Sequence, residues 1–471
     1  MVRRLLASRW FYIVAGTLMI LAFLMSQVRI GSDPRPPGSV ADIETLADRE
    51  DLNVLFILID TLRADRLSAY GYARETSPTI DELARTGLRF ARQQSQSSWT
   101  KCSMASLWTG LYPIRTGVLR SPQALPDSAR MPAEILRDAG FRTFAIWRNG
   151  WISPQFGFSQ GFEMYYSPPR SPVPRTVRRE NPIITLAGTD QDTARSAIEF
   201  FRTHGKERWF LYLHLMDVHQ YVYDEDTALF GTSYSDIYDN SIRWVDRIVG
   251  SVVHEIDRRG LREKTLIILA ADHGESFGEH GNEGHARDVY GEVTTTPFIL
   301  SFPFRLDPGI VVDARTQNVD LWPTILDLLD LTPLEDTDGR SRVPEILSAA
   351  NAAPSGSSPM SDDGMRFAHI DQAWGRTQRP PRPMVAVNEG KWRLIYRQDR
   401  PGRTELYEIY GDPLEQRNRA SEEPEILARL TGEAQAYLQR PPAPWGEAVD
   451  VELDEEELEH LRALGYDVGK P

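Results

Sequence analysis

The sequence predicts an α/β protein whose central sheet is mainly parallel and flanked by helices, because apolar runs alternate with amphipathic segments from Asn53 onward. The apolar runs are the expected strands, and they lie at residues 54–59, 143–146, 210–215, 265–270 and 298–302. Strands buried on both faces of a parallel sheet have this near-continuous apolar character. Helices are expected between several of them, for example at residues 79–86 and 238–258.

A smaller α+β subdomain is expected near the C-terminus, where residues 391–396 and 405–410 have the composition of strands. At 471 residues the chain is long enough for one large and one small domain. The predicted parts are a transmembrane anchor at 1–29, a linker at 30–50, the main domain at 51–348, a flexible Ala/Ser/Pro/Gly loop at 349–365, the C-terminal subdomain at 366–440, and an acidic tail at 441–471 with a solvated helix at 450–460.

The N-terminal segment predicts a single membrane span. The 19 residues 10–28 are uncharged and rich in Leu, Ile, Phe and Met, close to the ~20 residues that cross a hydrocarbon core. Arg3, Arg4 and Arg9 precede them, which favours a cytoplasmic N-terminus and a body on the periplasmic or extracellular side. A cleaved signal peptide is the alternative, but its apolar region is usually only about 7–15 residues long. We therefore expect an uncleaved anchor in the cell membrane.

Charge and cysteine content narrow the function. The formal net charge of −14 argues against general nucleic-acid binding, because a phosphate backbone is bound by a basic face. The single cysteine, Cys102, excludes an intrachain disulfide and a zinc site built from cysteines alone.

Acidic and histidine side chains follow two of the expected strands. Asp60 comes directly after the run 54–59, and Asp272-His273-Gly274-Glu275 follows the run that ends at Ala271. Ligands of α/β proteins collect beyond such strand ends. Two carboxylates and an imidazole suit one divalent ion (Mn²⁺, Zn²⁺ or Mg²⁺, with Ca²⁺ less suited to the histidine). Taken singly, each Asp would as readily cap a helix or pair with an arginine.

A second metal ion is a further option, for which Asp217 and His280 are the candidate ligands. Their spacing does not require it, so we expect one ion.

Thr100 is the candidate nucleophile. It lies in a polar turn, residues 98–110, that runs into a short expected helix, so free backbone N–H groups there favour an anion. A hydroxyl beside a divalent ion is activated enough to attack phosphorus or sulfur. A simple helix N-cap is the alternative interpretation.

Two more histidines fit the same site. His219 follows the strand 210–215, and His285 ends a glycine-rich loop after the Asp-His pair. Their imidazoles can bind nonbridging ester oxygens or protonate a leaving group. Either histidine alone would be assigned to a surface loop.

Together these motifs resemble the sulfatase-like branch of the alkaline phosphatase superfamily. The similarity runs from Asn53 to Tyr466 and is carried by the segments 53–65, 69–71, 106–113, 215–219, 272–275, 319–324, 405–415 and 461–466. The resemblance implies that Asp60, Asp272 and His273 bind metal and that Thr100 is both nucleophile and ligand. It also implies that His219 contacts the ester, and it places His285 where many members have a lysine.

The chain departs from the family pattern at its nucleophile. Sulfatases of this family convert a Cys or Ser in a Cys/Ser-x-Pro/Ala-x-Arg motif into formylglycine, but here that position is Thr100, which cannot be converted. Cys102 lacks the rest of the motif, Thr61 replaces a second Asp, and the usual basic residue after Thr143 is not evident. We therefore expect a membrane-anchored, metal-dependent hydrolase or transferase of phosphoesters.

Two alternatives remain open. The chain could be a sulfatase that works without formylglycine, or a catalytically silent domain that binds a glycan or a lipid.

Overall fold

The computed structural model describes residues 33–169, 171–181, 188–351 and 364–452, together with residues 17, 455, 458 and 461. The chain divides into two compact units, Met1–Arg35 and Pro36–Pro471. The predicted anchor falls in the first unit and, residue 17 apart, lies outside the described residues, as do most of the predicted loop 349–365 and most of the predicted helix 450–460. Among the described residues, none of the helices combines the length and apolar character needed to cross a membrane.

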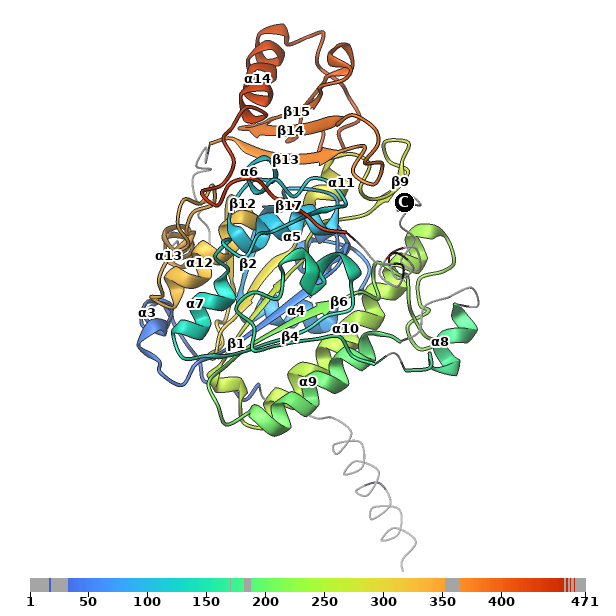
Figure 1. Ribbon diagram of the computed structural model, residues 1–471. Coiled ribbons are helices and arrows are strands. Elements are labelled where there is room, and N and C mark those ends of the chain that lie inside the picture. The colour runs from blue at the N-terminus through green and yellow to red at the C-terminus, as the bar shows by residue number, and fades with distance from the viewer. Residues whose placement is uncertain are drawn as a thin grey trace, which may run out of the picture. The chain divides into compact units, whose positions relative to one another are not determined.

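A mixed sheet forms the centre of the second unit (Figure 1). Within the described residues it has nine strands in the order β10-β2-β11-β7-β1-β6-β4-β5, and β12 pairs with β2. The strands are β1 (Asn53–Ile59), β2 (Leu88–Gln94), β4 (Arg142–Ile146), β5 (Met164–Tyr166), β6 (Trp209–Leu215), β7 (Thr265–Ala270), β10 (Thr295–Thr296), β11 (Phe298–Ser301) and β12 (Ile310–Gln317).

The central sheet is mainly parallel, as predicted, and its pairing of β12 with β2 is one of the parallel pairs. Strand β1 pairs in parallel with β6 and with β7, and β4 pairs in parallel with β6 and with β5. The run 298–302 is a strand as predicted, but β11 is antiparallel to both of its neighbours, β7 and β2. An apolar run of this length does not encode strand direction, so the sequence does not indicate which strands of a mainly parallel sheet are antiparallel.

Side chains of β1 alternate between the two faces of the sheet. Val54, Phe56 and Leu58 belong to one buried cluster, and the intervening Leu55, Ile57 and Ile59 belong to the other. The first cluster includes α5 (Thr100–Thr109), α7 (Pro132–Asp138) and α12 (Leu321–Leu328), and the second includes α4 (Pro78–Arg85), α9 (Asp190–His204) and α10 (Tyr234–Arg258). The sheet is therefore the middle layer of three.

The predicted helix 238–258 begins four residues early, as α10, because Ser233 caps it. The Ser233 hydroxyl accepts the backbone N–H of Asp236, and the Asp236 carboxylate in turn accepts the backbone N–H of Ser233.

The C-terminal subdomain contains an antiparallel sheet of four strands in the described residues. Strands β13 (Arg366–Asp371), β14 (Pro383–Glu389), β15 (Trp392–Arg397) and β16 (Glu405–Glu408) pair in sequence order, and α14 (Pro424–Tyr437) contacts β14 and β15. The predicted strands 391–396 and 405–410 correspond to β15 and β16. Asp450 lies in strand β17 (Val449–Asp450), which pairs with β3 (Gln123–Ala124), so the helix predicted from this residue is wrong at its start.

The remaining elements are short. They are α3 (Val40–Glu44), α6 (Pro113–Thr116), α8 (Arg175–Glu180), α11 (Gly291–Thr294), α13 (Val343–Asn351), β8 (Ser276–Phe277) and β9 (Glu283–Gly284).

Candidate active site

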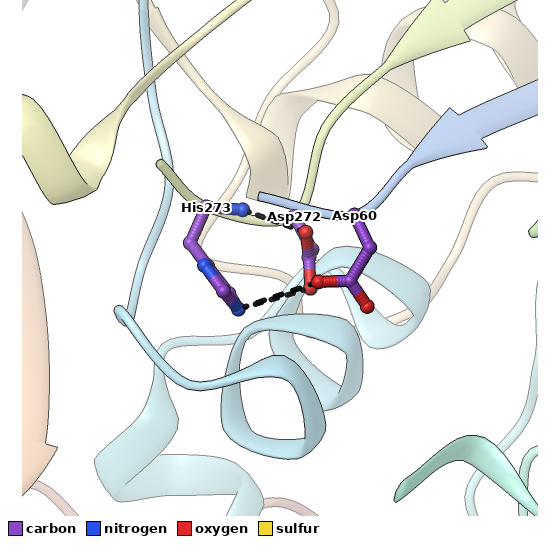
Figure 2. Close-up of side chains that lie close together, drawn as sticks. All are labelled: Asp60, Asp272 and His273. Carbon is purple, nitrogen blue, oxygen red and sulfur yellow. Dashed lines mark hydrogen bonds and ion pairs between the residues drawn. The ribbon is translucent and has the colours of Figure 1, made fainter. Parts of the chain in front are cut away.

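The candidate ligands gather where two adjacent parallel strands end. Asp60 directly follows β1, and Asp272 and His273 follow β7. Figure 2 shows the three side chains converging there. The Nε2 atom of His273 lies 3.3 Å from Oδ2 of Asp272 and 3.9 Å from Oδ1 of Asp60. All three side chains are fully buried.

One oxygen of each carboxylate is held by hydrogen bonds, and the other is left for a ligand. Oδ1 of Asp272 accepts the backbone N–H groups of Thr61 (3.2 Å) and His273 (2.9 Å). Oδ2 of Asp60 accepts Nδ2–H of Asn149 at 2.6 Å. The opposite oxygens, Oδ1 of Asp60 and Oδ2 of Asp272, are buried and have no hydrogen-bond partner among the described residues. A buried, unpaired carboxylate oxygen is costly unless a cation offsets its charge.

The tautomer of His273 suits the same role. Its Nδ1 lies 3.0 Å from the carbonyl oxygen of Gly274, so Nδ1–H donates there and Nε2 keeps its lone pair. The unpaired oxygens and this nitrogen lie within 4.8 Å of one another. Two carboxylate oxygens and one imidazole nitrogen fit a divalent ion such as Zn²⁺ or Mn²⁺.

Electrostatics support a cation at this point. Burial and the neighbouring Asp60 carboxylate raise the pKa of Asp272. Burial alone would raise the pKa of Asp60 too, but a hydrogen bond from His214 and the nearby imidazoles of His219 and His273 hold it well below its usual range. Two adjacent buried carboxylates repel each other, and a divalent ion would remove that repulsion.

The hydroxyl of Thr100 faces the candidate metal ligands. Its Oγ1 lies 3.2 Å from Nε2 of His273, and Nδ2 of Asn149 approaches that hydroxyl at 3.5 Å. Thr100 is the first residue of α5, while the N-cap position is occupied by Trp99. The N-cap interpretation of Thr100 is therefore wrong. Its hydroxyl points toward the candidate metal ligands instead.

His219 and His285 lie beside this group. The ring centroids of His273 and His285 are 4.7 Å apart, and those of His285 and His219 are 4.8 Å apart. His219 lies in the turn after β6, and His285 directly follows β9. Burial lowers the pKa of both imidazoles to about 4, so both are uncharged at neutral pH. Nδ1 of His285 lies 3.2 Å from the buried carboxylate of Glu275, which fixes the ring orientation.

Comparison with known proteins places this geometry in a family. The sulfatase family model matches residues 52–331, and the model for the C-terminal part of N-sulphoglucosamine sulphohydrolase matches residues 278–438. This chain belongs to the sulfatase family. The resemblance inferred from the motifs is thus confirmed, and with it membership of the alkaline phosphatase superfamily.

Individual relatives are distant. N-acetylgalactosamine-6-sulfatase of Canis lupus familiaris is 25% identical over 387 residues, which is 71% of each chain. The solved structure of a 2-O GAG sulfatase has a TM-score of 0.67 at 19% identity and covers 83% of this chain and 92% of its own. The phosphonate monoester hydrolase of Agrobacterium radiobacter has a TM-score of 0.64 at 19% identity and covers 85% of this chain and 100% of its own. These two structures show a shared fold.

Thr61 does not act as a ligand in place of the second family aspartate. Its hydroxyl donates to the carbonyl oxygen of Asp60 at 2.7 Å. Its φ of 61° is left-handed, which a β-branched residue adopts at a cost of about 1–3 kcal/mol. This backbone conformation accompanies the N–H donated to Asp272, so Thr61 serves the site through its main chain.

Cys102 has no part in the site's chemistry. Burial raises the pKa of its thiol to about 12, and its Sγ lies 3.9 Å from the carbonyl oxygen of His369. A thiol of this kind is unreactive.

The two residues suggested for a second metal ion are not brought together. The carboxylate of Asp217 accepts hydrogen bonds from Arg148 at 2.7 Å and from the backbone N–H of Asp190 at 2.8 Å. His280 instead pairs with Glu292, in a separate cluster. The described residues therefore support one metal position between the strand ends.

Two site residues were missed by the sequence analysis, namely Asn149 and His214. Nε2 of His214 lies 3.0 Å from Oδ2 of Asp60, and Nδ1 of His214 lies 2.6 Å from the hydroxyl of Tyr212. Burial raises the pKa of Tyr212 well above its usual range, so its O–H donates to Nδ1 and His214 donates from Nε2 to Asp60. The i, i+2 spacing of Tyr212 and His214 on one strand was the available signal.

Proposed function

We propose that this chain is a metal-dependent hydrolase of singly charged tetrahedral esters, with Thr100 as the nucleophile. The observation that carries the proposal is the 3.2 Å approach of Oγ1 of Thr100 to Nε2 of His273, beside two carboxylate oxygens that lack hydrogen bonds within the described residues. A divalent ion held by Asp60, Asp272 and His273 would stabilise the threonine alkoxide and polarise the ester.

The protein's own residues then complete a two-step reaction. Oγ1 of Thr100 attacks the sulfur or phosphorus, its proton passes to the neutral imidazole of His219 or His285, and the bond to the departing alcohol breaks as the group is transferred to Thr100. The imidazole that has accepted this proton then gives it to the departing alcohol, and the neighbouring imidazole can hydrogen-bond the ester oxygens. Water then attacks the transferred group and frees the Thr100 hydroxyl, or an acceptor alcohol does so in a transfer reaction.

The charge of the site favours a substrate with one negative charge. Among the described residues, no lysine or arginine side chain hydrogen-bonds to Asp60, Thr100, Asp272 or His273. Arg148 is held by Asp190 and Asp217, and Lys101 donates to the carbonyl oxygen of Ser121. A phosphate monoester carries two negative charges and would find few cations at this site. A sulfate monoester or a phosphodiester carries one negative charge and needs fewer cations.

Sulfate esters of glycans are supported by the relatives. Both N-acetylgalactosamine-6-sulfatase and the 2-O GAG sulfatase are named for sulfate esters. This support favours a sulfatase over the phosphoesterase expected from the sequence.

Phosphodiesters are supported by the nucleophile itself. The hydrated aldehyde of formylglycine has two hydroxyl groups, so one of them can expel the group that was transferred to the other. Threonine has a single hydroxyl group. The group on Thr100 must therefore leave by attack at sulfur or phosphorus, which is the ordinary course of phosphoryl transfer through a covalent intermediate. The phosphonate monoester hydrolase with the same fold acts on a phosphorus centre.

Matched substrates test the proposal and separate the two esters. Turnover of the full-length protein on 4-nitrophenyl sulfate, bis(4-nitrophenyl) phosphate and 4-nitrophenyl phosphate would be measured with Mn²⁺, Zn²⁺, Mg²⁺ or Ca²⁺. We expect metal-dependent cleavage of the sulfate or the diester, faster than that of the monoester, and a loss of at least ~1,000-fold in Thr100→Ala. Thr100→Ser is the matched control and should keep part of the activity. Full turnover by Thr100→Ala would refute the nucleophile, and metal-free protein without any turnover would support a binding domain.

We also propose that residues 10–28 anchor the protein in the membrane with its body on the extracytoplasmic side. The support is the uncharged 19-residue run and the three arginines before it. Membrane fractionation with protease protection tests this: the body should sediment with membranes and be cleaved from the outer side. Recovery in the soluble fraction would refute the anchor.

A further inference from the structure

An exposed arginine lies beside the candidate active site. Arg287 follows His285 by two residues, and its side chain is exposed. Within the part of the chain that the structure describes, its guanidinium group has no hydrogen-bond or ion-pair partner. The reaction proposed above gives this positive charge no role. A group from outside the chain can therefore pair with it.

The main chain that carries Arg287 is held by three hydrogen bonds. The backbone N–H of Ala286 donates to the carbonyl oxygen of Ser98 at 2.7 Å. Nε1–H of Trp374 donates to the carbonyl oxygen of Ala286 at 3.0 Å, and Nε2–H of Gln372 donates to that of Arg287 at 2.8 Å. The φ of Ala286 is 59°, a strained left-handed conformation for a residue with a Cβ. The backbone is thus fixed where Arg287 begins, whereas its side chain is left to solvent.

The charge of Arg287 acts on two rings of the site. Burial lowers the pKa of His285 to about 4, and the positive charge of Arg287 contributes to that fall. Burial raises the pKa of Tyr234 to about 12, and the same charge opposes that rise. Tyr234 is the first residue of α10 and is partly exposed. The guanidinium group therefore lies close to both rings, on a side of His285 that solvent can reach.

The acidic side chains near Arg287 in sequence do not neutralise it. Asp288 is buried, and its Oδ2 accepts Nδ2–H of Asn282 at 2.7 Å. Glu283 is exposed on β9 and makes no ion pair with Arg287 in the described structure. A guanidinium group binds carboxylate, sulfate and phosphate groups through two parallel N–H donors. The charge of Arg287 therefore suits an oxyanion that a substrate brings with it.

We propose that Arg287 determines specificity by pairing with a second anionic group, which the alcohol part of the ester carries. The inference rests on the proposed function, in which His219 or His285 gives a proton to the departing alcohol. That alcohol must lie next to the imidazoles, and Arg287 is the exposed charge beside His285. The reacting ester keeps its single negative charge. The substrate class is thus an ester of an anionic alcohol.

Two probes that differ by one charge test the proposal. They are esters of 3-hydroxybenzoate and of 3-hydroxybenzamide, whose carboxylate and carboxamide have nearly the same size, each prepared as the sulfate and as the methyl phosphate. Calorimetry on full-length Thr100→Ala with Mn²⁺ measures their affinities without turnover. We expect the carboxylate esters to bind about fivefold more tightly than the carboxamide esters at low salt. Because salt screens an exposed ion pair, ~0.5 M NaCl should remove most of this preference.

Variants at Arg287 assign the preference to its charge. Adding Arg287→Gln should abolish it, Arg287→Lys should keep part of it, and Arg287→Glu should reverse it in favour of the carboxamide. Arg202→Gln on α9 is the control, because it removes an exposed arginine of another surface and should leave the preference unchanged. In protein with intact Thr100, Arg287→Gln should raise KM for the carboxylate esters with little change in kcat, since the contact is the same in the bound substrate and in the transition state.

Two results would overturn the inference. One is equal affinity of Thr100→Ala for the carboxylate and carboxamide esters at low salt. The other is a preference that persists in both Arg287→Gln and Arg287→Glu, with circular dichroism showing that each variant is folded. A failure of the proposed function looks different: the parent turns over none of the probes, while the preference that depends on Arg287 remains. That result would support Arg287 as the residue that recognises the anion and refute the reaction.

Discussion

Two clusters in the described residues combine a histidine with two carboxylates, and they differ in what their atoms already bind. Asp60, Asp272 and His273 form one, and His280, Glu292 and Glu415 form the other; in each, three potential ligand atoms lie within 4.8 Å of one another. In the first, one oxygen of each aspartate has no hydrogen-bond partner among the described residues.

In the second cluster the same kinds of atoms are engaged. Nδ1 of His280 lies 2.7 Å from Oε1 of Glu292, and Nε2 lies 3.0 Å from the carbonyl oxygen of Glu415. The Glu415 carboxylate contacts Arg393 with one oxygen and accepts the backbone N–H of Gly291 with the other. The comparison teaches that ligand composition alone does not define a metal site. Carboxylate oxygens without a hydrogen-bond partner define it. The second cluster, which we call the clasp, instead links the loop that leads to His285 with the C-terminal subdomain.

The largest expected difference between the two clusters is in metal binding. Asp272→Asn removes a charged ligand whose Oδ2 has no other partner in the described structure, so we expect bound metal and turnover to fall to background. The matched variant Glu292→Gln, in the clasp, should keep its metal. Metal content after dialysis, measured by mass spectrometry, checks both. Equal metal loss from the two variants would contradict the comparison.

The clasp should matter to stability instead. In Glu415→Gln the buried guanidinium of Arg393 loses its carboxylate partner, 3.1 Å away, and we expect the free energy of unfolding to fall by about 3–5 kcal/mol. Urea denaturation measures this. The double variant Glu415→Leu/Arg393→Met should be less destabilised than Glu415→Gln, because neither charge remains buried alone. A double variant as unstable as Glu415→Gln would assign the loss to packing rather than to the unpaired charge.

The sequence predicts strands well where every residue is buried and poorly where the strand is only partly buried. All seven residues of β1 are buried, so its apolar run was evident. β2 and β12 carry Arg92 and Arg315 and are only partly buried, because they line the boundary with the C-terminal subdomain. Their mixed composition resembles that of a loop, and only the paired structure identifies them as strands.

The same reasoning explains which site residues the sequence could indicate. Asp60 and Asp272 follow apolar runs, so their convergence depends only on adjacent parallel strands. His214 lies inside such a run, and it meets Asp60 because the register of β1 and β6 pairs Leu58 with His214. Register between distant strands is not encoded in the local pattern, so this contact could not be predicted.

His214 gives the third prediction, which concerns the orientation of a ligand. In His214→Ala, Asp60 loses one of the two side-chain donors that hold its Oδ2, so we expect metal affinity to fall about 10–100-fold with the fold intact. His214→Gln keeps an N–H donor and should recover part of the loss, and Tyr212→Phe should cost less than His214→Ala. Competition with a chelator gives the dissociation constants. If His214→Gln is as weak as His214→Ala, the hydrogen bond is not what positions Asp60.

The smallest expected effect is the pH dependence of the clasp. Burial alone would lower the pKa of His280, but its hydrogen bonds to Glu292 and to the carbonyl of Glu415 raise it to about 9, from 6.5 for a free histidine. A group with a raised pKa in the folded state contributes stability that is fully present below about pH 6.5 and is lost as the pH rises through about 9.

Few other groups around His280 titrate in that window. The ring centroid of His280 lies 3.8 Å from that of Tyr290, on which it stacks, and 6.4 Å from that of Tyr407. Burial raises the pKa of both phenols well above their usual range. Burial also raises the pKa of the nearby carboxylates of Asp288 and Glu415, so the comparison with a variant that lacks the imidazole is needed to isolate the titration of His280. We therefore expect the stability difference between the parent and His280→Gln, measured by urea denaturation, to shrink steadily from pH 6 to pH 9.5. A difference that does not change with pH would mean that His280 holds the clasp as a neutral ring, through its stacking on Tyr290 rather than through its charge.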